Sequence, residues 1–219
     1  MIELTAADGH RLSAYTAGPA DAQRALVVVQ EIFGVNSNMR RICDVFAAEG
    51  YAVVAPALFD RVARGTDLAY GPEDVQRGRT LKGQVPEAGT MLDIEAAAAA
   101  LPKGAKRGII GYCWGGTVAW WGATRSTSFA AAVGWYGGGI AGTRTEVPHC
   151  PVELHFGETD HAIPMSDVDA IRAAQPGVGI FVYKGAGHGF GCDERDSYSA
   201  PDARLAQARS LEFLNIHLG

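Results

Sequence analysis

The 219-residue sequence lacks most features that would point to a metal, a membrane or a nucleic acid. Its four cysteines form no C-x-x-C pair and show no zinc-ligand spacing, so neither a metal site nor a disulfide framework is indicated. No apolar stretch approaches the length of a membrane span, and the first residues do not form a signal peptide. The net charge of -5 gives no reason to expect nucleic acid as a partner. We therefore expect reduced thiols, a cytoplasmic location and a small-molecule substrate.

The composition is that of an ordinary globular protein. Hydrophobic residues make up 47% of the chain and charged residues 20%, which is enough to build a sizeable core. The length suits one domain of α/β size, and the sequence shows no internal repeat and no linker. We therefore predict a single domain over residues 1–219 and expect it to be a monomer.

The order of the predicted elements favours a doubly wound, mostly parallel sheet with helices on both faces. A hairpin of residues 2–5 and 11–16 opens the chain around the turn at Asp8-Gly9. Strand and helix patterns then alternate, as in parallel α/β sheets. The remaining predicted strands cover residues 25–30, 51–55, 108–110, 129–135, 152–156 and 179–183, and the predicted helices cover 37–49, 73–82, 87–101, 117–121, 166–174 and 203–217.

One segment carries the main prediction of function: Gly111-Tyr112-Cys113-Trp114-Gly115-Gly116. It is the nucleophile-elbow pattern G-x-S-x-G with cysteine in place of serine. Side chains two positions before or after the nucleophile would clash in so tight a strand–turn–helix corner. The turn would also place the thiol at a helix N-terminus, where the helix dipole favours thiolate. The alternative is an ordinary corner that carries a buried, inert cysteine.

Two loops that follow later strands supply a candidate acid and a candidate base. Asp160 lies just after one predicted strand, and His188, flanked by glycines, lies just after the next. The chain order Cys113, Asp160, His188 is the order of nucleophile, acid and histidine in α/β-hydrolases. Glu158 is a competing candidate for the acid. Because the carboxyl ends of parallel strands meet at one edge of a sheet, we expect these side chains to come together.

The end of the buried strand at 25–30 supplies three further candidates. Glu31 would lie near Cys113, where a carboxylate could take the thiol proton or hold it until substrate arrives. The alternative is a solvated loop glutamate. The backbone N–H groups of Ile32 and Trp114 are the predicted oxyanion hole, because α/β-hydrolases place one donor in each of these two loops.

These motifs resemble the dienelactone hydrolase (carboxymethylenebutenolidase) family. The resemblance implies an α/β-hydrolase fold and a hydrolase that needs no cofactor and no metal. It implies that Cys113 is the nucleophile, that His188 and Asp160 complete a triad, and that Glu31 deprotonates the thiol when substrate binds. The family substrate is dienelactone, an unsaturated lactone that carries a carboxylate and is opened to maleylacetate. The matching segments are Gln30-Glu31-Ile32-Phe33-Gly34, Gly111-Tyr112-Cys113-Trp114-Gly115-Gly116, Gly157 with Asp160 and Pro164, and Gly187-His188-Gly189-Phe190.

The substrate pocket departs from the family pattern. Family members specialised for dienelactone hold its carboxylate with two arginines and a tyrosine. Arg77, in the polar segment 60–86, resembles the first arginine, with a surface arginine as the alternative. Leu81 and Cys192 stand where the tyrosine and the second arginine are expected, and Arg195 is the nearest replacement.

The last predictions concern two aromatic residues of the pocket and the function of the protein. We expect Phe33 and Tyr136 to line the pocket, although an aromatic residue at the end of a strand is as often a packing residue. We predict a hydrolase that opens a dienelactone-type lactone or ester through a thioester of Cys113. One alternative is a general carboxylesterase or thioesterase on the same triad, which the two replaced pocket residues favour. The other is a non-catalytic ligand-binding or redox-sensing protein.

Overall fold

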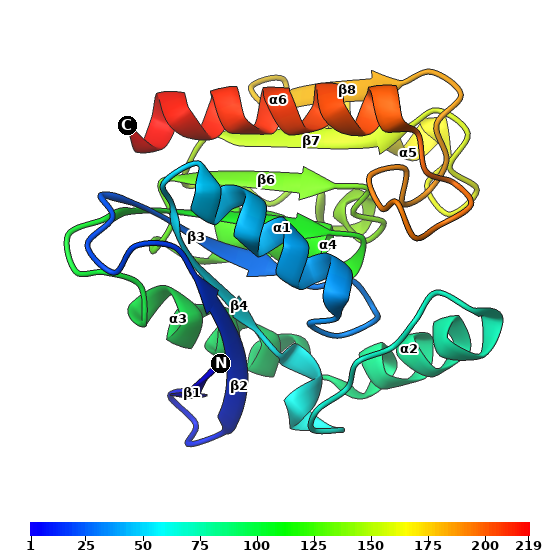
Figure 1. Cartoon of the computed structure of the whole chain (residues 1–219). Coiled ribbons are helices and arrows are strands. Elements are labelled where there is room, and N and C mark those ends of the chain that lie inside the picture. The colour runs from blue at the N-terminus through cyan, green and yellow to red at the C-terminus, as the bar shows by residue number, and fades with distance from the viewer.

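The computed structural model describes residues 1–219 and is built around one eight-stranded sheet (Figure 1). The strands lie in the order β1-β2-β4-β3-β5-β6-β7-β8. The hairpin β1–β2 is antiparallel and β2 pairs antiparallel with β4, whereas all later neighbours are parallel. The strands are β1 (Ile2–Thr5), β2 (Arg11–Ala17), β3 (Arg24–Val29), β4 (Ala52–Pro56), β5 (Lys106–Tyr112), β6 (Ala131–Trp135), β7 (Val152–Gly157) and β8 (Gly179–Tyr183).

Helices cover both faces of the sheet, as predicted. Figure 1 shows α1 and α6 in front of the strands and α3 and α4 behind them. None of the helices combines the length and the apolar composition that crossing a membrane requires. The α-helices are α1 (Ser37–Ala48), α2 (Pro72–Gln84), α3 (Glu87–Ala99), α4 (Trp114–Arg125), α5 (Met165–Ala174) and α6 (Ala200–Leu218), and the 3-10 helices are η1 (Leu58–Arg61) and η2 (Ile140–Thr143).

Three central strands, β3, β4 and β6, are buried because their sequences are continuous apolar runs. Every residue of β4 and β6 is buried, and β3 is buried from Ala25 onward. Strands that are covered by helices on both faces have no polar side to present to water, which explains the absence of alternation. The carboxyl ends of β3, β5, β7 and β8 lie at one edge of the sheet, and the candidate residues are in the loops that follow these strands.

The structure moves several predicted boundaries, and one of them, the end of β3, lies just before Glu31. The strand ends at Val29, one residue before the predicted end, and the side-chain amide of Gln30 bonds to groups outside the sheet. Its Oε1 accepts the Leu58 N–H at 3.0 Å, and its Nε2 donates to the Glu31 carbonyl at 3.1 Å. The chain therefore turns at Glu31. Helix α2 is longer than predicted, and the two 3-10 helices were not predicted.

Helix α2 is attached to the rest of the protein differently from the other helices. In Figure 1 it extends away from the sheet, beyond the carboxyl ends of the strands. Gly78 is its one buried residue. A Cβ atom at Gly78 would overlap the carbonyl group of Ile32, so only glycine allows the helix to approach this loop.

Candidate active site

Cys113 lies at a sharp turn between β5 and α4. Its backbone has φ 55° and ψ -116°, a left-handed conformation that costs a residue with a side chain on the order of 1–3 kcal/mol. Backbone hydrogen bonds hold it: the Cys113 N–H donates to the Trp135 carbonyl at 3.0 Å, and the Cys113 carbonyl accepts the N–H groups of Gly116 at 3.0 Å and Thr117 at 3.4 Å. Such strain is often stored at functional sites.

The glycines around Cys113 are required by close backbone contacts. A Cβ atom at Gly111 would overlap the carbonyl of Gly115, and one at Gly115 would overlap the carbonyl of Val29. These are the positions two residues before and two residues after the cysteine. The turn therefore has the tight packing that the motif predicts.

This packing predicts the effect of one substitution on stability. We expect Gly115→Ala to lower the free energy of unfolding by at least about 2 kcal/mol, because neither backbone segment can move aside cheaply. The matched control is Gly83→Ala in α2, where a Cβ atom would meet nothing within 4 Å. That change should raise the free energy by about 0.5 kcal/mol through helix propensity. Urea denaturation of both variants measures the difference, and equal values would contradict the tight turn.

The structure brings together the three side chains that the chain order singled out. Nε2 of His188 lies 3.2 Å from Sγ of Cys113, and Nδ1 of His188 lies 2.7 Å from Oδ2 of Asp160. The other carboxylate oxygen of Asp160 accepts the N–H groups of Ala162 at 2.8 Å and Ile163 at 3.2 Å. Asp160 is buried, so its orientation is fixed by these bonds.

Glu158, the competing acid, is held away from His188. Its Oε2 accepts the N–H of Gly185 at 2.9 Å, which ties together the loops that follow β7 and β8. The carboxylate on His188 is therefore that of Asp160.

The partners of His188 favour its charged form. Burial by itself lowers the pKa of His188, but the hydrogen bonds with Asp160 and Cys113 outweigh burial and raise the pKa to about 10. The imidazole is therefore protonated at neutral pH, and its positive charge faces the sulfur. The loop is fixed from behind, because the Ser197 hydroxyl donates to the His188 carbonyl at 2.6 Å.

Glu31 is buried beside the site, but it does not contact the thiol. Its Oε1 lies 3.3 Å from Nη1 of Arg195, and its Oε2 accepts the hydroxyl of Tyr70 at 3.2 Å. Only 1% of its side chain is exposed. Burial raises the pKa of Glu31 above its usual range, although Arg195 and His188 oppose the shift. Glu31 is thus not a solvated loop residue.

The two predicted oxyanion donors are free to bind a ligand. The N–H of Ile32 donates to no backbone or side-chain acceptor, and the N–H of Trp114 is at the first position of α4, where a helix offers no partner. Both residues line the same cavity as Cys113 and His188. A carbonyl oxygen placed between them would meet two preorganised donors.

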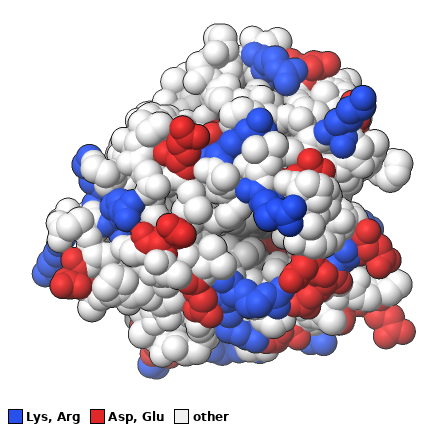
Figure 2. All heavy atoms as spheres, turned by 45° about the horizontal axis from the view of Figure 1, so that its top comes forward, with Lys and Arg blue, Asp and Glu red and all other residues white.

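The cavity around Cys113 has a volume of about 300 Å³ and contains three arginine and lysine side chains in addition to His188. Arg79 and Lys82 reach it from α2, and Arg195 reaches it from the loop after β8. Arg79 and Lys82 make no ion pair within the protein. Figure 2 shows Lys and Arg interspersed with Asp and Glu over the visible face, so a positive environment for a ligand has to be built locally.

The predictions for three pocket residues have different outcomes. Phe33 lines the cavity, as expected. Arg77 does not, and this prediction is corrected by the phase of α2: Gly78, Arg79 and Lys82 share the face toward the site, whereas Arg77 is exposed on another face. Tyr136 is buried behind the imidazole, with its ring 5.1 Å from that of His188, and it packs there rather than lining the cavity.

Sequence reasoning missed Arg79, Lys82 and Tyr70. For the first two a signal was present: residues 75, 78, 79 and 82 have the spacing of one helical face, and Gly78 marks the side of close approach. Tyr70 lies in a segment without a regular pattern, so nothing in the sequence placed it beside Glu31. The structure holds no group of three or more His, Cys, Asp or Glu side chains arranged to bind a metal ion.

Comparisons with known proteins identify the family of this chain. The residue pattern of the dienelactone hydrolase family matches residues 12–218. A "Putative carboxymethylenebutenolidase" of Synechocystis is 38% identical over 229 residues, which cover 95% of this chain and 93% of that protein. A "Carboxymethylenebutenolidase" of Pseudomonas putida is 36% identical over 227 residues, which cover 97% and 94%. The crystal structure of a "Putative Dienelactone Hydrolase" of Klebsiella pneumoniae has a TM-score of 0.83 at 30% identity, covering 98% of this chain and 97% of that one.

These similarities extend over nearly the full length of the chain and over its whole sheet. They confirm the α/β-hydrolase fold that the order of strands and helices predicts. The matched residues 12–218 include the turn at Cys113 and both loops that carry Asp160 and His188. The chain therefore belongs to the dienelactone hydrolase family and is a hydrolase that acts on carboxylic ester bonds.

Proposed function

We propose that the protein hydrolyses a carboxylate-bearing lactone or ester, of the dienelactone type, through a thioester of Cys113. The observation that carries the proposal is the linked set Cys113–His188–Asp160, with distances of 3.2 Å and 2.7 Å, at a strained turn. Binding alone would not require this arrangement, since it is the one that activates a nucleophile. The four cysteines are free thiols, which fits our inference that the enzyme acts in the reducing cytoplasm.

The first half-reaction forms the thioester. The Cys113 thiolate attacks the carbonyl carbon while the N–H groups of Ile32 and Trp114 stabilise the oxyanion. The carbon–oxygen bond of the ester or lactone then breaks, and His188 gives its proton to the leaving oxygen. Asp160 keeps the imidazole oriented and stabilises its positive charge.

The second half-reaction restores the enzyme. Neutral His188 takes a proton from water, the resulting hydroxide attacks the thioester, and the carbon–sulfur bond breaks. The products are a carboxylic acid and the thiolate, again facing a protonated His188. Each turnover consumes one water molecule and no cofactor.

Glu31 adds a second base to this scheme. Its carboxylate is paired with Arg195. A substrate carboxylate that binds Arg195 competes with Glu31 for the same guanidinium. We infer that Glu31 then becomes free to accept a proton from any Cys113 that is still in the thiol form.

The proposed substrate charge leads to a direct test on α2. We expect the double variant Arg79→Met, Lys82→Met to lower kcat/KM for dienelactone by about 10–100-fold, because loss of one charge-assisted hydrogen bond to the substrate carboxylate is worth about 1.5–3 kcal/mol. The same variant should hydrolyse a neutral five-membered lactone at nearly the wild-type rate. Arg77→Met is the matched control, since that arginine lies on the same helix but faces away.

The experiment uses purified wild type and the two α2 variants with dienelactone, the neutral lactone and p-nitrophenyl acetate. A loss confined to dienelactone supports a carboxylate-bearing substrate. Wild-type preference for the neutral compounds would contradict it and favour the general esterase, with the same chemistry at Cys113.

A further inference from the structure

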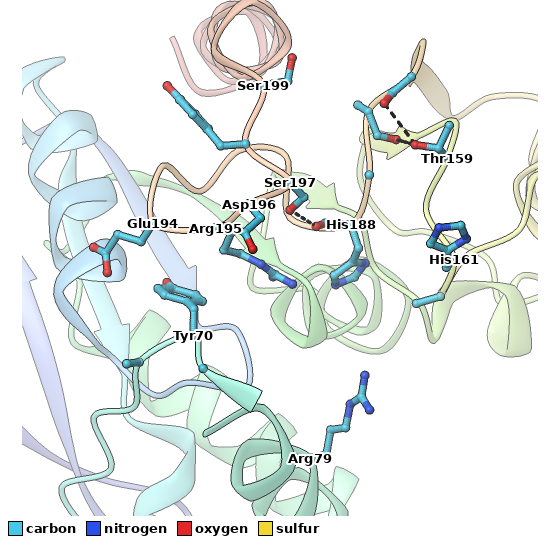
Figure 3. Close-up of a pocket in the computed structure, with 17 residues that line it drawn as sticks. Tyr70, Arg79, Thr159, His161, His188, Glu194, Arg195, Asp196, Ser197 and Ser199 are labelled. Carbon is cyan, nitrogen blue, oxygen red and sulfur yellow. Dashed lines mark hydrogen bonds between the residues drawn. The ribbon is translucent and has the colours of Figure 1, made fainter. Parts of the chain in front are cut away.

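A second, larger cavity opens next to the one that holds Cys113. Its volume is about 1020 Å³, against about 300 Å³ for the inner cavity. Arg79, Ala162, His188 and Arg195 line both, so the two spaces meet at the imidazole. Figure 3 shows Arg79 pointing from α2 toward the space in front of His188 and Arg195, with His161 on the far side. We call this larger space the outer cleft.

The position of His188 decides which part of an ester enters the outer cleft. Cys113, Ile32 and Trp114 line only the inner cavity, so the carbonyl carbon under attack lies there. The leaving oxygen must lie within hydrogen-bond reach of Nε2 of His188, which supplies its proton. The bond that breaks therefore points from the inner cavity toward the outer cleft. The acyl portion occupies the inner cavity and the alcohol portion occupies the cleft.

The sizes of the two spaces suggest a substrate larger than a small lactone. Ligand pockets are typically about 300–1,000 Å³, so the inner cavity is at the small end of this range and the outer cleft at the large end. A small lactone fits within the inner cavity alone and leaves the cleft unused. An ester with a bulky alcohol uses both.

The free groups of the outer cleft are both donors and acceptors. The side chains of His161, Asp196, Tyr198 and Arg79 line it and make no hydrogen bond or ion pair within the protein. His161 and Asp196 are exposed to solvent, so a ligand can reach them. A carboxylate accepts hydrogen bonds, a guanidinium donates them, and an imidazole or a phenol can do either. Hydroxyl groups match such a set, because each one both donates and accepts.

The charged side chains of the cleft further restrict the class of alcohol that can bind there. Arg195 is paired with Glu31, and Glu194 is paired with Arg41, so the charged groups of the cleft that have no ion pair are Arg79 and Asp196, one of each sign. A charged alcohol of either sign is attracted by one of these two side chains and repelled by the other, whereas a neutral alcohol meets no repulsion. An apolar alcohol would leave the polar side chains without partners after displacing their water, which costs binding energy.

We propose that the outer cleft binds a neutral polyhydroxylated alcohol, such as a sugar, as the leaving portion of an ester substrate. This inference rests on the proposed thioester mechanism and narrows its substrate class. The bond from Sγ of Cys113 to the acyl carbon forms, and the bond from that carbon to the sugar oxygen breaks. The proton of His188 ends on that sugar oxygen, and water then releases the acyl group as described above.

The test compares three half-esters of succinic acid that share one acyl group and its free carboxylate. Their alcohols are glucose esterified at its primary hydroxyl, cyclohexylmethanol as an apolar alcohol of similar size, and methanol. We expect kcat/KM for the glucose half-ester to exceed both others by at least about 10-fold, the equivalent of about one or two additional hydrogen bonds. A glucose half-ester that is no faster than the cyclohexylmethyl half-ester overturns the proposal.

Variants locate the preference in the cleft. In the double variant His161→Ala, Asp196→Ala we expect the ratio of kcat/KM for the glucose and methyl half-esters to fall toward one. Asp21→Ala, an exposed aspartate between β2 and β3, is the control and should keep the wild-type ratio. An unchanged ratio in the double variant contradicts the role of the cleft. Cys113-dependent hydrolysis of the methyl half-ester without any glucose preference overturns this inference alone, whereas no hydrolysis of any half-ester counts against the proposed function as well.

Discussion

Replacing Cys113 with alanine is expected to lower kcat for ester hydrolysis by on the order of 10⁴-fold or more, because removal of a nucleophile that acts as a unit with its base abolishes nearly all of the acceleration. The substitution removes one sulfur atom and leaves the turn in place. Its binding of substrate should therefore survive, so KM changes far less than kcat. Steady-state kinetics with p-nitrophenyl acetate and dienelactone measure both quantities.

Cys150→Ala is the matched control for this experiment. Cys150 is half-buried in the loop before β7, and burial raises the pKa of its thiol to about 11, so it is a poor nucleophile at neutral pH. We expect this variant to keep the wild-type rate. Near-native turnover by Cys113→Ala would mean that another group attacks the substrate and that the proposed thioester does not form.

Replacing Asp160 with asparagine is expected to lower kcat by about 10³–10⁴-fold, as for the equivalent change in serine hydrolases. The amide cannot stabilise the positive imidazole, and it favours the wrong tautomer. Because the bond to Asp160 raises the pKa of His188, this variant should also change the pH profile.

The direction of that change follows from the proton that His188 must donate. In the wild type the pKa of His188 is raised to about 10, so the acid form is present at neutral pH and is lost as pH rises through that value. We expect kcat/KM of the wild type to fall on the alkaline side near pH 10. In Asp160→Asn the pKa of His188 is lower, so the residual activity should fall at a lower pH.

Glu158→Gln separates this role from that of the neighbouring carboxylate. Glu158 binds the Gly185 N–H rather than the imidazole, and glutamine can still accept that bond. We expect kcat within about threefold of the wild type and an unchanged alkaline limb. A loss like that of Asp160→Asn would show that the acid on His188 has been assigned to the wrong residue.

The fold was predictable because its signals are local. Strands β3, β4 and β6 contain continuous apolar runs, and the opening hairpin has an Asp-Gly turn. Strand β8 has the same bounds in prediction and structure. The end of β3 was not predictable, because it depends on the amide of Gln30 binding the Leu58 N–H, a contact between segments 28 residues apart. Element boundaries set by such tertiary contacts leave no local pattern in a sequence.

The candidate site also has a part that was predictable from the sequence and a part that was not. The order of Cys113, Asp160 and His188 indicated which side chains would meet, since residues that follow parallel strands emerge at one edge. The pair of Glu31 and Arg195 was beyond prediction, because it joins residues 164 positions apart through the conformation of an irregular loop. Arg77 was preferred to Arg79 because a motif gives positions but not the rotation of the helix about its axis.

The attachment of α2 through Gly78 has a consequence for how this enzyme can diversify. The thiol, its base and its oxyanion donors all lie on the sheet frame, whereas Arg79 and Lys82 are on a helix whose one buried residue is Gly78. Val75 and Leu81 pack partly buried against the core, but most other positions of that helix are exposed and meet little packing constraint. Substrate choice and bond cleavage are therefore separable traits, and a lineage can acquire a new preference by altering α2 while it inherits the reaction unchanged.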